Sequence, residues 1–268
     1  MTEHAAHGVL ATRYRSPGGP LNMNRGDAQV SPQFYARAIG VLYLVVIVVG
    51  FFAYGYVPGR LVSGDAAVTA NNILTHSLLW RAGILAGLIM VICAIPQLLF
   101  EYLLLRPVQR HVALLFVLFN VISLAIESLS GLGHLAALAI VSGQGSLSGI
   151  AVHQLQAWAA LAIDLHDSDV NISFLFFGCV CLLYGYLIFR STFLPRFLGV
   201  LMTIAGLCYG ANSTLVFLDL HLLPSSGIPL LLAPAGLSEL ILCLWLLIFG
   251  VDAPKWHRQY AQLSGLEE

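Results

Sequence analysis

The residues of this chain that could do chemistry are a few ionisable and amide side chains set deep in apolar stretches. Glu127 lies fifteen residues after Val112, and Glu239 lies ten residues after Pro229. A charged side chain near the centre of a membrane helix costs about 2.5–3.5 kcal/mol on an insertion scale. Because hydrogen bonds between membrane helices contribute only about 0.6 kcal/mol on average, we expect such acids to bind a solute or exchange a proton.

Glu127 also belongs to a polar stripe. Side chains at a 3-4-3-4 spacing share one face of a helix. The residues with this spacing are Asn120, Ser123, Glu127, Ser130 and His134. Lipid would penalise such a face, so it is predicted to face the interior of a helix bundle.

Two further polar residues are placed to join these acids. Arg81 is the basic residue that could reach them as a counter-charge, and Asn212 has a similar depth on another apolar stretch. We therefore expect a polar cluster that binds a solute or relays protons. Its predicted members are Arg81, Glu127, His134, Asn212 and Glu239. Glu101 is instead expected to pair with Arg106 or Arg110 at the membrane surface.

A second group of residues raises the possibility of a metal site. His134, Asp164 and His166 are all expected toward the outer side of the membrane. A zinc site needs three or four converging ligands, and no two histidines have the i, i+4 spacing of a His-Glu-x-x-His site. Capping, hydrogen bonding or solvation is the alternative role, and no cofactor is predicted.

The elements that hold these residues must be membrane helices. The chain has 268 residues, of which 59% are hydrophobic and 9% charged, and its mean hydropathy is +0.86. Soluble domains average roughly 25% charged residues, so a soluble fold would lack polar residues to cover its surface. The net charge of −1 gives no electrostatic basis for nucleic acid as a partner. The predicted surroundings are the lipid bilayer.

Six stretches are long and apolar enough to cross the bilayer, for which about 20 residues suffice. They are Ala36–Val57, Leu78–Leu105, Val112–Val141, Val170–Phe189, Phe197–Leu218 and Pro229–Gly250. The ambiguous segment is Gly149–His166. With six spans, all Lys and Arg residues except Arg60 and Arg81 lie on one side, whereas a seventh span would divide them evenly. The positive-inside rule therefore favours six.

The predicted fold is an all-α polytopic membrane bundle of about six transmembrane helices, with Gly149–His166 as an outer interfacial helix. Residues 1–33 are expected to be a disordered cytoplasmic tail, because they are polar and rich in Gly, Pro and Arg. Residues 34–251 form the transmembrane domain, and residues 252–268 form a cytoplasmic C-terminal tail. The predicted location is the bacterial cytoplasmic (inner) membrane with both termini in the cytoplasm. Translation could start at Met1 or Met23.

Several segments, in order, resemble one bacterial membrane family. They are Gly64-Asp65-Ala66-Ala67, Asn72-Ile73-Leu74 with His76 and Arg81, Leu104-Leu105-Arg106-Pro107-Val108, Asp164-Leu165-His166, Phe193-Leu194-Pro195-Arg196-Phe197-Leu198-Gly199, and Glu239 before Trp245. These segments are similar to domain-of-unknown-function family 4386, over about Ala36 to Gly250. The resemblance implies a bacterial multi-pass membrane protein and carries no activity or substrate.

Three functions remain open at this point. The first is a non-catalytic membrane component or sensor, whose protein partner is unknown. The second is a small-solute or proton-linked transporter that uses Glu127 and Glu239. The third is an outer-face metal-dependent intramembrane hydrolase with His134, Asp164 and His166 as ligands. A dry, closed contact between the polar residues would favour the first, and a cavity with unpaired acids would favour the second.

Overall fold

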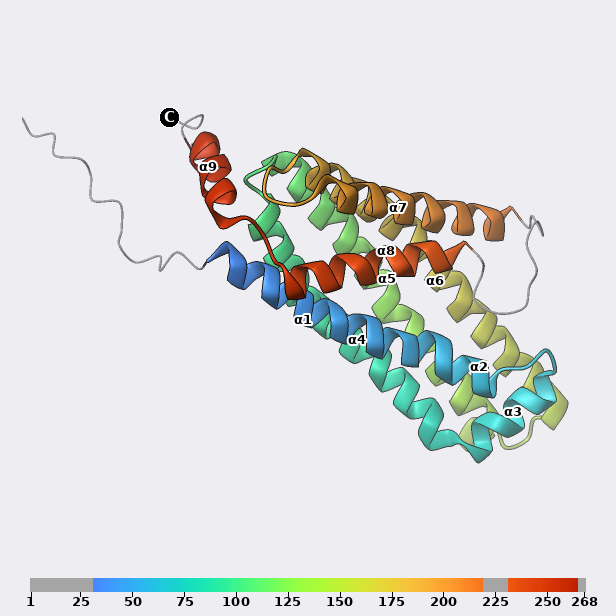
Figure 1. Ribbon diagram of the computed structural model, residues 1–268. Helices are drawn as coiled ribbons and strands as arrows, with labels where there is room; N and C mark the ends of the chain where they lie inside the picture. Colours follow the sequence, from blue (N-terminus) through green and yellow to red (C-terminus); the bar gives the residue numbers. More distant parts are fainter. Residues whose placement is uncertain (1–30, 219–230, 265–268) are drawn as a thin grey trace, which may run out of the picture. The chain divides into compact units, whose positions relative to one another are not determined.

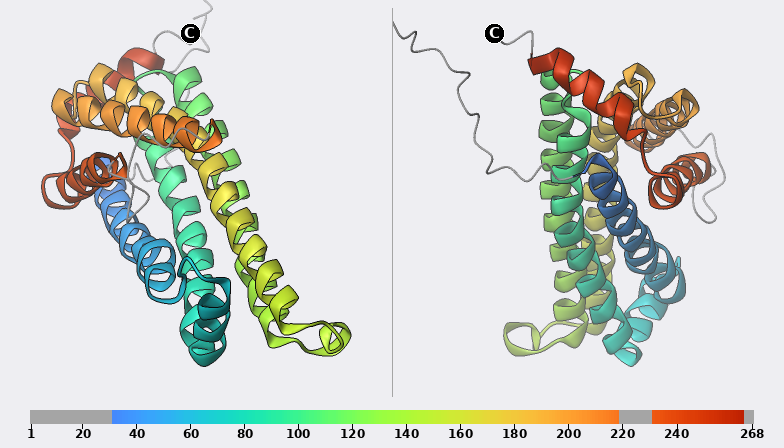
Figure 2. Two further views of the ribbon diagram at one scale, coloured as in Figure 1. Left: turned by 90° about the vertical axis from the view of Figure 1, so that its right-hand side faces the viewer. Right: turned by 60° about the vertical axis from the view of Figure 1, so that its left-hand side comes forward.

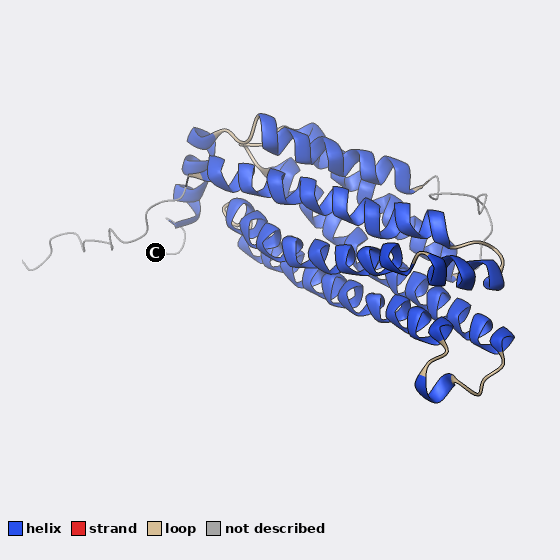
Figure 3. Ribbon diagram, turned by 90° about the horizontal axis from the view of Figure 1, so that it is seen from below, coloured by secondary structure: helices blue, strands red, loops and turns tan. Residues whose placement is uncertain are grey.

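The computed structural model describes residues 31–218 and 231–264, which form helices and turns and no strand (Figures 1 and 3). The elements are α1 (Pro32–Gly50), a π-helical stretch (Phe51–Tyr56), α2 (Val57–Leu61), α3 (Ala66–Thr75), α4 (Ser77–Leu105), α5 (Arg110–Ser142), a 3-10 turn (Gly145–Leu147), α6 (Val152–Arg190), α7 (Arg196–Phe217), α8 (Leu232–Ile248) and α9 (Ala253–Ser264).

Most of these helices are long and apolar enough to span a membrane. The continuous run Pro32–Leu61, which joins α1, the π-helical stretch and α2, qualifies together with α4, α5, α6 and α7. The sixth candidate is α8, which qualifies only as a pair with α9, bent from it by 100°. Residues 229 and 230, where the sixth span was predicted to begin, lie outside the described residues. The prediction of an all-α, multi-pass membrane bundle is confirmed.

The segment predicted as a separate interfacial helix is part of a longer one. From Val152 onward it forms the first part of α6, which runs unbroken for 39 residues. At 1.5 Å per residue that is about 58 Å, well beyond the roughly 30 Å hydrocarbon core. The reason is packing, because Leu155, Ala159 and Ala162 form a buried stripe beneath the polar residues of this segment. Figure 2 shows α5 and α6 running side by side.

Six helices close into a ring. Each is in contact with the next in the order α1, α4, α5, α6, α7 and α8, and α8 returns to α1. The short helix α3 lies against α4, α5 and α6. This arrangement places one face of every spanning helix toward a common centre.

One end of the ring gathers the turns that carry arginines. The Trp256 indole of α9 donates a hydrogen bond to the carbonyl oxygen of Leu104 at 2.9 Å. The backbone N–H of Asp252 donates to the carbonyl oxygen of Phe193 at 3.1 Å. The end of α4, the α6–α7 turn and the α8–α9 turn are therefore neighbours, as six spans require. We call this the arginine end, because Arg106, Arg110, Arg190 and Arg196 flank its turns, and the opposite end the α3 end.

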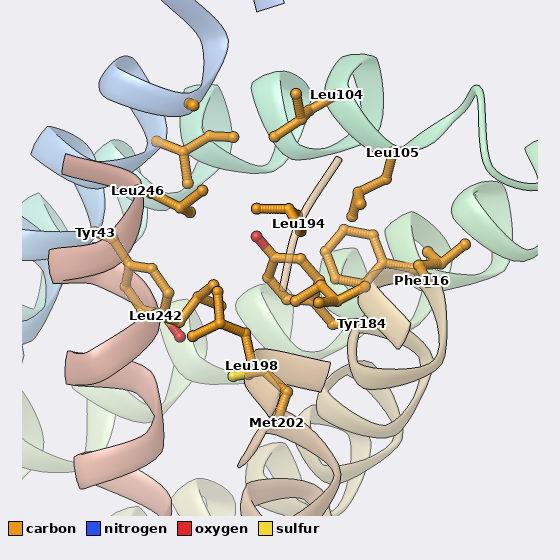
Figure 4. Close-up of a cluster of buried hydrophobic side chains, with 14 of the residues drawn as sticks. Tyr43, Leu104, Leu105, Phe116, Tyr184, Leu194, Leu198, Met202, Leu242 and Leu246 are labelled. Atoms are coloured by element: carbon orange, nitrogen blue, oxygen red, sulfur yellow. The ribbon is translucent and has the colours of Figure 1, made fainter. Parts of the chain in front are cut away.

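Buried apolar side chains fill the ring near the arginine end. They include Leu104, Leu198, Leu242 and Leu246, and Figure 4 shows them beside Tyr43 and Tyr184. The same cluster contains Phe116 and Met202.

Glycines bring α6 and α7 into backbone contact. A Cβ atom added at Gly206 would lie 2.7 Å from the carbonyl oxygen of Gly178, and one added at Gly199 would lie 2.7 Å from that of Gly185. Real Cβ atoms do not come this close, so these positions accept only glycine without a shift of the helices. Gly210, one turn after Gly206, meets nothing within 4 Å.

This difference predicts the stability of two matched variants in one helix. Gly206→Ala should lower the thermal denaturation temperature in detergent, because the added methyl forces α6 and α7 apart at a cost of about 1–3 kcal/mol. Gly210→Ala should leave that temperature unchanged or raise it slightly, because alanine is the better helix former. Equal effects of both substitutions would contradict the close contact.

Candidate functional site

The ring encloses a cavity of about 320 Å³ that is lined by all six of its helices. This volume lies in the range of about 300–1,000 Å³ that small-molecule sites occupy. Tyr43, Phe116, Tyr184 and Met202 line the cavity and also belong to the apolar cluster. The cluster therefore borders the cavity on the side of the arginine end.

Three carboxyl groups from three helices line this cavity. They belong to Glu101 of α4, Glu127 of α5 and Glu239 of α8. None of the described residues that line the cavity is Lys, Arg or His. The protein has thus placed three acids around one space within its membrane helices and has supplied no basic group there.

Glu239 is held by two tyrosines from neighbouring helices. The Tyr43 hydroxyl of α1 donates to its Oε2 atom at 2.9 Å, and the Tyr209 hydroxyl of α7 donates to its Oε1 atom at 2.5 Å. The side chain of Glu239 is buried. These bonds satisfy the carboxyl group and connect three members of the ring.

Glu101 is a cavity residue that the sequence analysis placed elsewhere. Gln97, one turn earlier on α4, donates from Nε2 to Oε1 of Glu101 at 3.0 Å, and the Tyr184 side chain is a second hydrogen-bond partner. The expected partner Arg106 instead lies over the Tyr260 ring, with 5.6 Å between the guanidinium carbon and the ring centroid. The fact that Gln97 and Glu101 lie four residues apart was the available signal for this polar pair.

Glu127 differs from the other two acids. Its half-buried side chain borders the cavity and also a small adjoining pocket, which contains His134 and His166. No hydrogen-bond donor or basic group of the described residues satisfies its carboxyl group. Glu127 is therefore the acid of the cavity whose carboxyl group has no partner among residues 31–218 and 231–264.

Two histidines beside Glu127 are part of a row of four neighbouring rings, in which the Trp80 ring is tilted by 57° against that of His134. The centroids of His134 and His166 are 3.6 Å apart, Trp80 lies 4.5 Å from His134, and Tyr54 lies 5.8 Å from His166. His166 Nδ1 is 2.8 Å from the carbonyl oxygen of Ser130. The Trp80 indole N–H donates to the carbonyl oxygen of His134 at 2.9 Å. Tyr54 comes from the π-helical stretch. Such stretches are frequent at functional sites.

The structure brings together only part of the predicted polar cluster. Glu127 and Glu239 line one cavity, and His134 lies in the pocket next to Glu127. Asn212 is buried outside the cavity, where its amide donates to Oδ1 of Asn171 at 2.9 Å. Arg81 is exposed and forms no ion pair with any described residue. The Trp80 side chain points into the bundle, and Arg81, the next residue, points about 100° away from it around the helix axis.

The predicted metal ligands do not converge. His134 and His166 are in contact, but Asp164 is exposed. Asp164 lies two residues before His166 on the same helix, so its side chain points about 200° away from the His166 ring. Within the described residues, no three His, Cys, Asp or Glu side chains lie together as a metal ion requires. This geometry gives no support to the metal-dependent hydrolase.

The fold and the cavity define a multi-pass membrane protein with an acid-lined site inside its helix bundle. The chain belongs to the family described as a domain of unknown function (DUF4386), whose model matches residues 38–250. An uncharacterized protein of Archaeoglobus fulgidus is 28% identical over 116 residues, which cover 43% of this chain and 56% of that protein. No solved structure matches the chain. The match covers only about half of that relative's length, so nothing about the relative's role is transferred to this chain.

The bonds around Glu239 predict how three substitutions combine. Tyr43→Phe together with Tyr209→Phe should lower the denaturation temperature, because a buried acceptor without a donor costs about 1–3 kcal/mol. Adding Glu239→Leu should recover most of this loss, since apolar replacement of all partners is nearly neutral. Tyr186→Phe, an exposed tyrosine bonded to Gln109, is the control. A triple variant no more stable than the double one would rule out this arrangement.

Proposed function

We propose that this protein is a small-solute transporter that uses Glu127 and Glu239 to bind its solute or to exchange protons. The observation that carries the proposal is a cavity within the membrane helices whose lining, in the part of the chain that the structure describes, has three acids and no basic group. An uncompensated negative charge is costly there. Each acid therefore takes up either a proton or a cationic partner, and that choice is the chemical basis of proton-linked transport.

The volume of the cavity separates this proposal from a purely structural role. A polar cluster that only holds helices together would be a closed contact between side chains, with no free volume between them. Here Glu127 and Glu239 face a space of about 320 Å³. A sensor or non-catalytic component could bind a ligand in the same cavity, but it would not move that ligand across the membrane.

Transport also requires access from each side in turn. The apolar cluster with Leu104, Leu198 and Leu246 separates the cavity from the arginine end. One irregular element lines the cavity and a second lies next to the cavity residue Gln97, and both are places where a helix can bend. They are the π-helical stretch in the first span and Pro96 in α4, which leaves the carbonyl of Ile92 without its helical donor. We assign the bending that opens the arginine end to these elements.

Solute-dependent proton movement tests the proposal. The purified protein is reconstituted into liposomes that contain the pH indicator pyranine, and ethidium, glucose, alanine and lactate are added in turn. At least one of the four should move protons in a protein-dependent way. Because the acids are the exchange sites, Glu127→Gln and Glu239→Gln should lower that rate by about tenfold or more.

Asp164→Asn is the matched control, because Asp164 is an exposed acid of α6 that does not line the cavity. It should transport like the unmodified protein. The proposal fails if none of the four solutes moves protons, or if both Gln variants behave like the unmodified protein while folded.

The proposed membrane is the bacterial cytoplasmic membrane, with the arginine end in the cytoplasm as the positive-inside rule predicts. Ser148→Cys, exposed at the α3 end, should react with a membrane-impermeant maleimide in intact cells. Thr192→Cys, exposed at the arginine end, should react only after the cells are permeabilised. The unmodified protein shows the background from its own cysteines. The reverse pattern would overturn this orientation.

A further inference from the structure

Donors that line the cavity are engaged with two of its three acids. Glu239 occupies the hydroxyl donors of Tyr43 and Tyr209, and Glu101 occupies the Nε2 donor of Gln97. A tyrosine hydroxyl has one hydrogen to give, and a carboxylate has none. Both tyrosine hydroxyls and one N–H of Gln97 are therefore already engaged with the acids of the cavity.

Two acceptors that border the cavity remain unmatched. The Oε1 atom of Gln97 has no hydrogen-bond partner. It is buried, since only 8% of the residue is exposed. The carboxyl group of Glu127 has no donor in the described part of the chain. Buried polar atoms are nearly always hydrogen-bonded in proteins, and the described residues supply no donor to the Gln97 Oε1 atom or to the half-buried Glu127 carboxyl group. These two acceptors mark where the donors of a ligand would bind.

The walls of the cavity add a second requirement. Most of the lining is apolar, and it includes two groups of aromatic rings. The Tyr209 ring lies 5.0 Å from that of Phe174 and 5.2 Å from that of Phe177, and the rings of Phe116 and Tyr184 are 5.2 Å apart. Aromatic faces attract cations and also bury apolar bodies well. A hydrated metal ion would leave these walls without a partner.

We infer that the solute of this cavity is an organic ammonium ion with an apolar, ring-bearing body. Its N–H groups would donate to Glu127, the acid that the protein leaves unmatched, and its body would lie against the aromatic walls. An ammonium group has three donors, no acceptor and a positive charge, which is the complement of the lining. This inference rests on the proposed function, because it names the class of solute that the same cavity takes.

A matched ligand series tests the inference on the unmodified protein. The probes are 3,3-diphenylpropylammonium, its neutral alcohol 3,3-diphenylpropan-1-ol and its anion 3,3-diphenylpropanoate, which share one body. Isothermal titration calorimetry in detergent should give the ammonium ion a Kd at least about tenfold below that of the alcohol, with no binding of the carboxylate. Equal binding of the ammonium ion and the alcohol, or tighter binding of the carboxylate, would overturn the inference.

One substitution then assigns the position of the charge. Glu127→Gln keeps the size of the side chain and removes its charge, so it should abolish the preference for the ammonium ion over the alcohol. Asp164→Asn should retain that preference. If Glu127→Gln is unfolded, the three-ligand series on the unmodified protein still decides the class of solute. A folded Glu127→Gln variant with an unchanged preference would overturn the role of Glu127.

The failure of this inference is distinguishable from the failure of transport. If the ammonium ion binds selectively but the liposomes show no solute-dependent proton movement, the solute class stands and the protein is a receptor. If a neutral solute or an anion moves protons through the protein while the ammonium ion does not bind, transport stands and the solute class is overturned.

Discussion

The lack of water in the hydrocarbon core is the constraint on which this structure depends. A carboxyl group inside the bilayer must find partners within the protein or from a ligand, because lipid offers none. Glu239 finds two tyrosines and Glu101 finds Gln97 and Tyr184. Each of these arrangements needs helices that face a common centre. The closed ring of six helices supplies that centre, and the cavity is its consequence.

Neighbouring helices of the ring approach one another closely at some positions, and the ring encloses a cavity at others. Gly178 and Gly206 let the backbones of α6 and α7 touch, and Gly40 lies so close to α8 that a Cβ atom there would be 2.8 Å from the backbone nitrogen of Leu247. Close approach at these seams is the usual role of small residues between membrane helices. The aromatic side chains beside the α6–α7 seam, Phe174, Phe177 and Tyr209, line the cavity.

All residues that line the cavity lie within the part of the chain that the family model matches. The match covers residues 38–250, and the cavity residues lie between Tyr43 and Glu239. The site therefore belongs to the family domain rather than to the segments before and after it. Within the site, Glu127 and Tyr54 border both the large cavity and the small pocket that contains His134 and His166.

The sequence alone determined the class of fold, the spans and the inward polar stripe of α5, because hydropathy and helical spacing are local properties of the chain. It also identified Glu127 and Glu239, since an acid deep in an apolar stretch is conspicuous without any structure. Only the tertiary structure decided that Glu101 joins them, that Arg81 points outward and that the polar segment before Val170 continues into α6. Those outcomes depend on how each helix is rotated about its axis and on which helices are its neighbours. Both are set by contacts such as Gly178 with Gly206, whose partners lie far apart in the sequence.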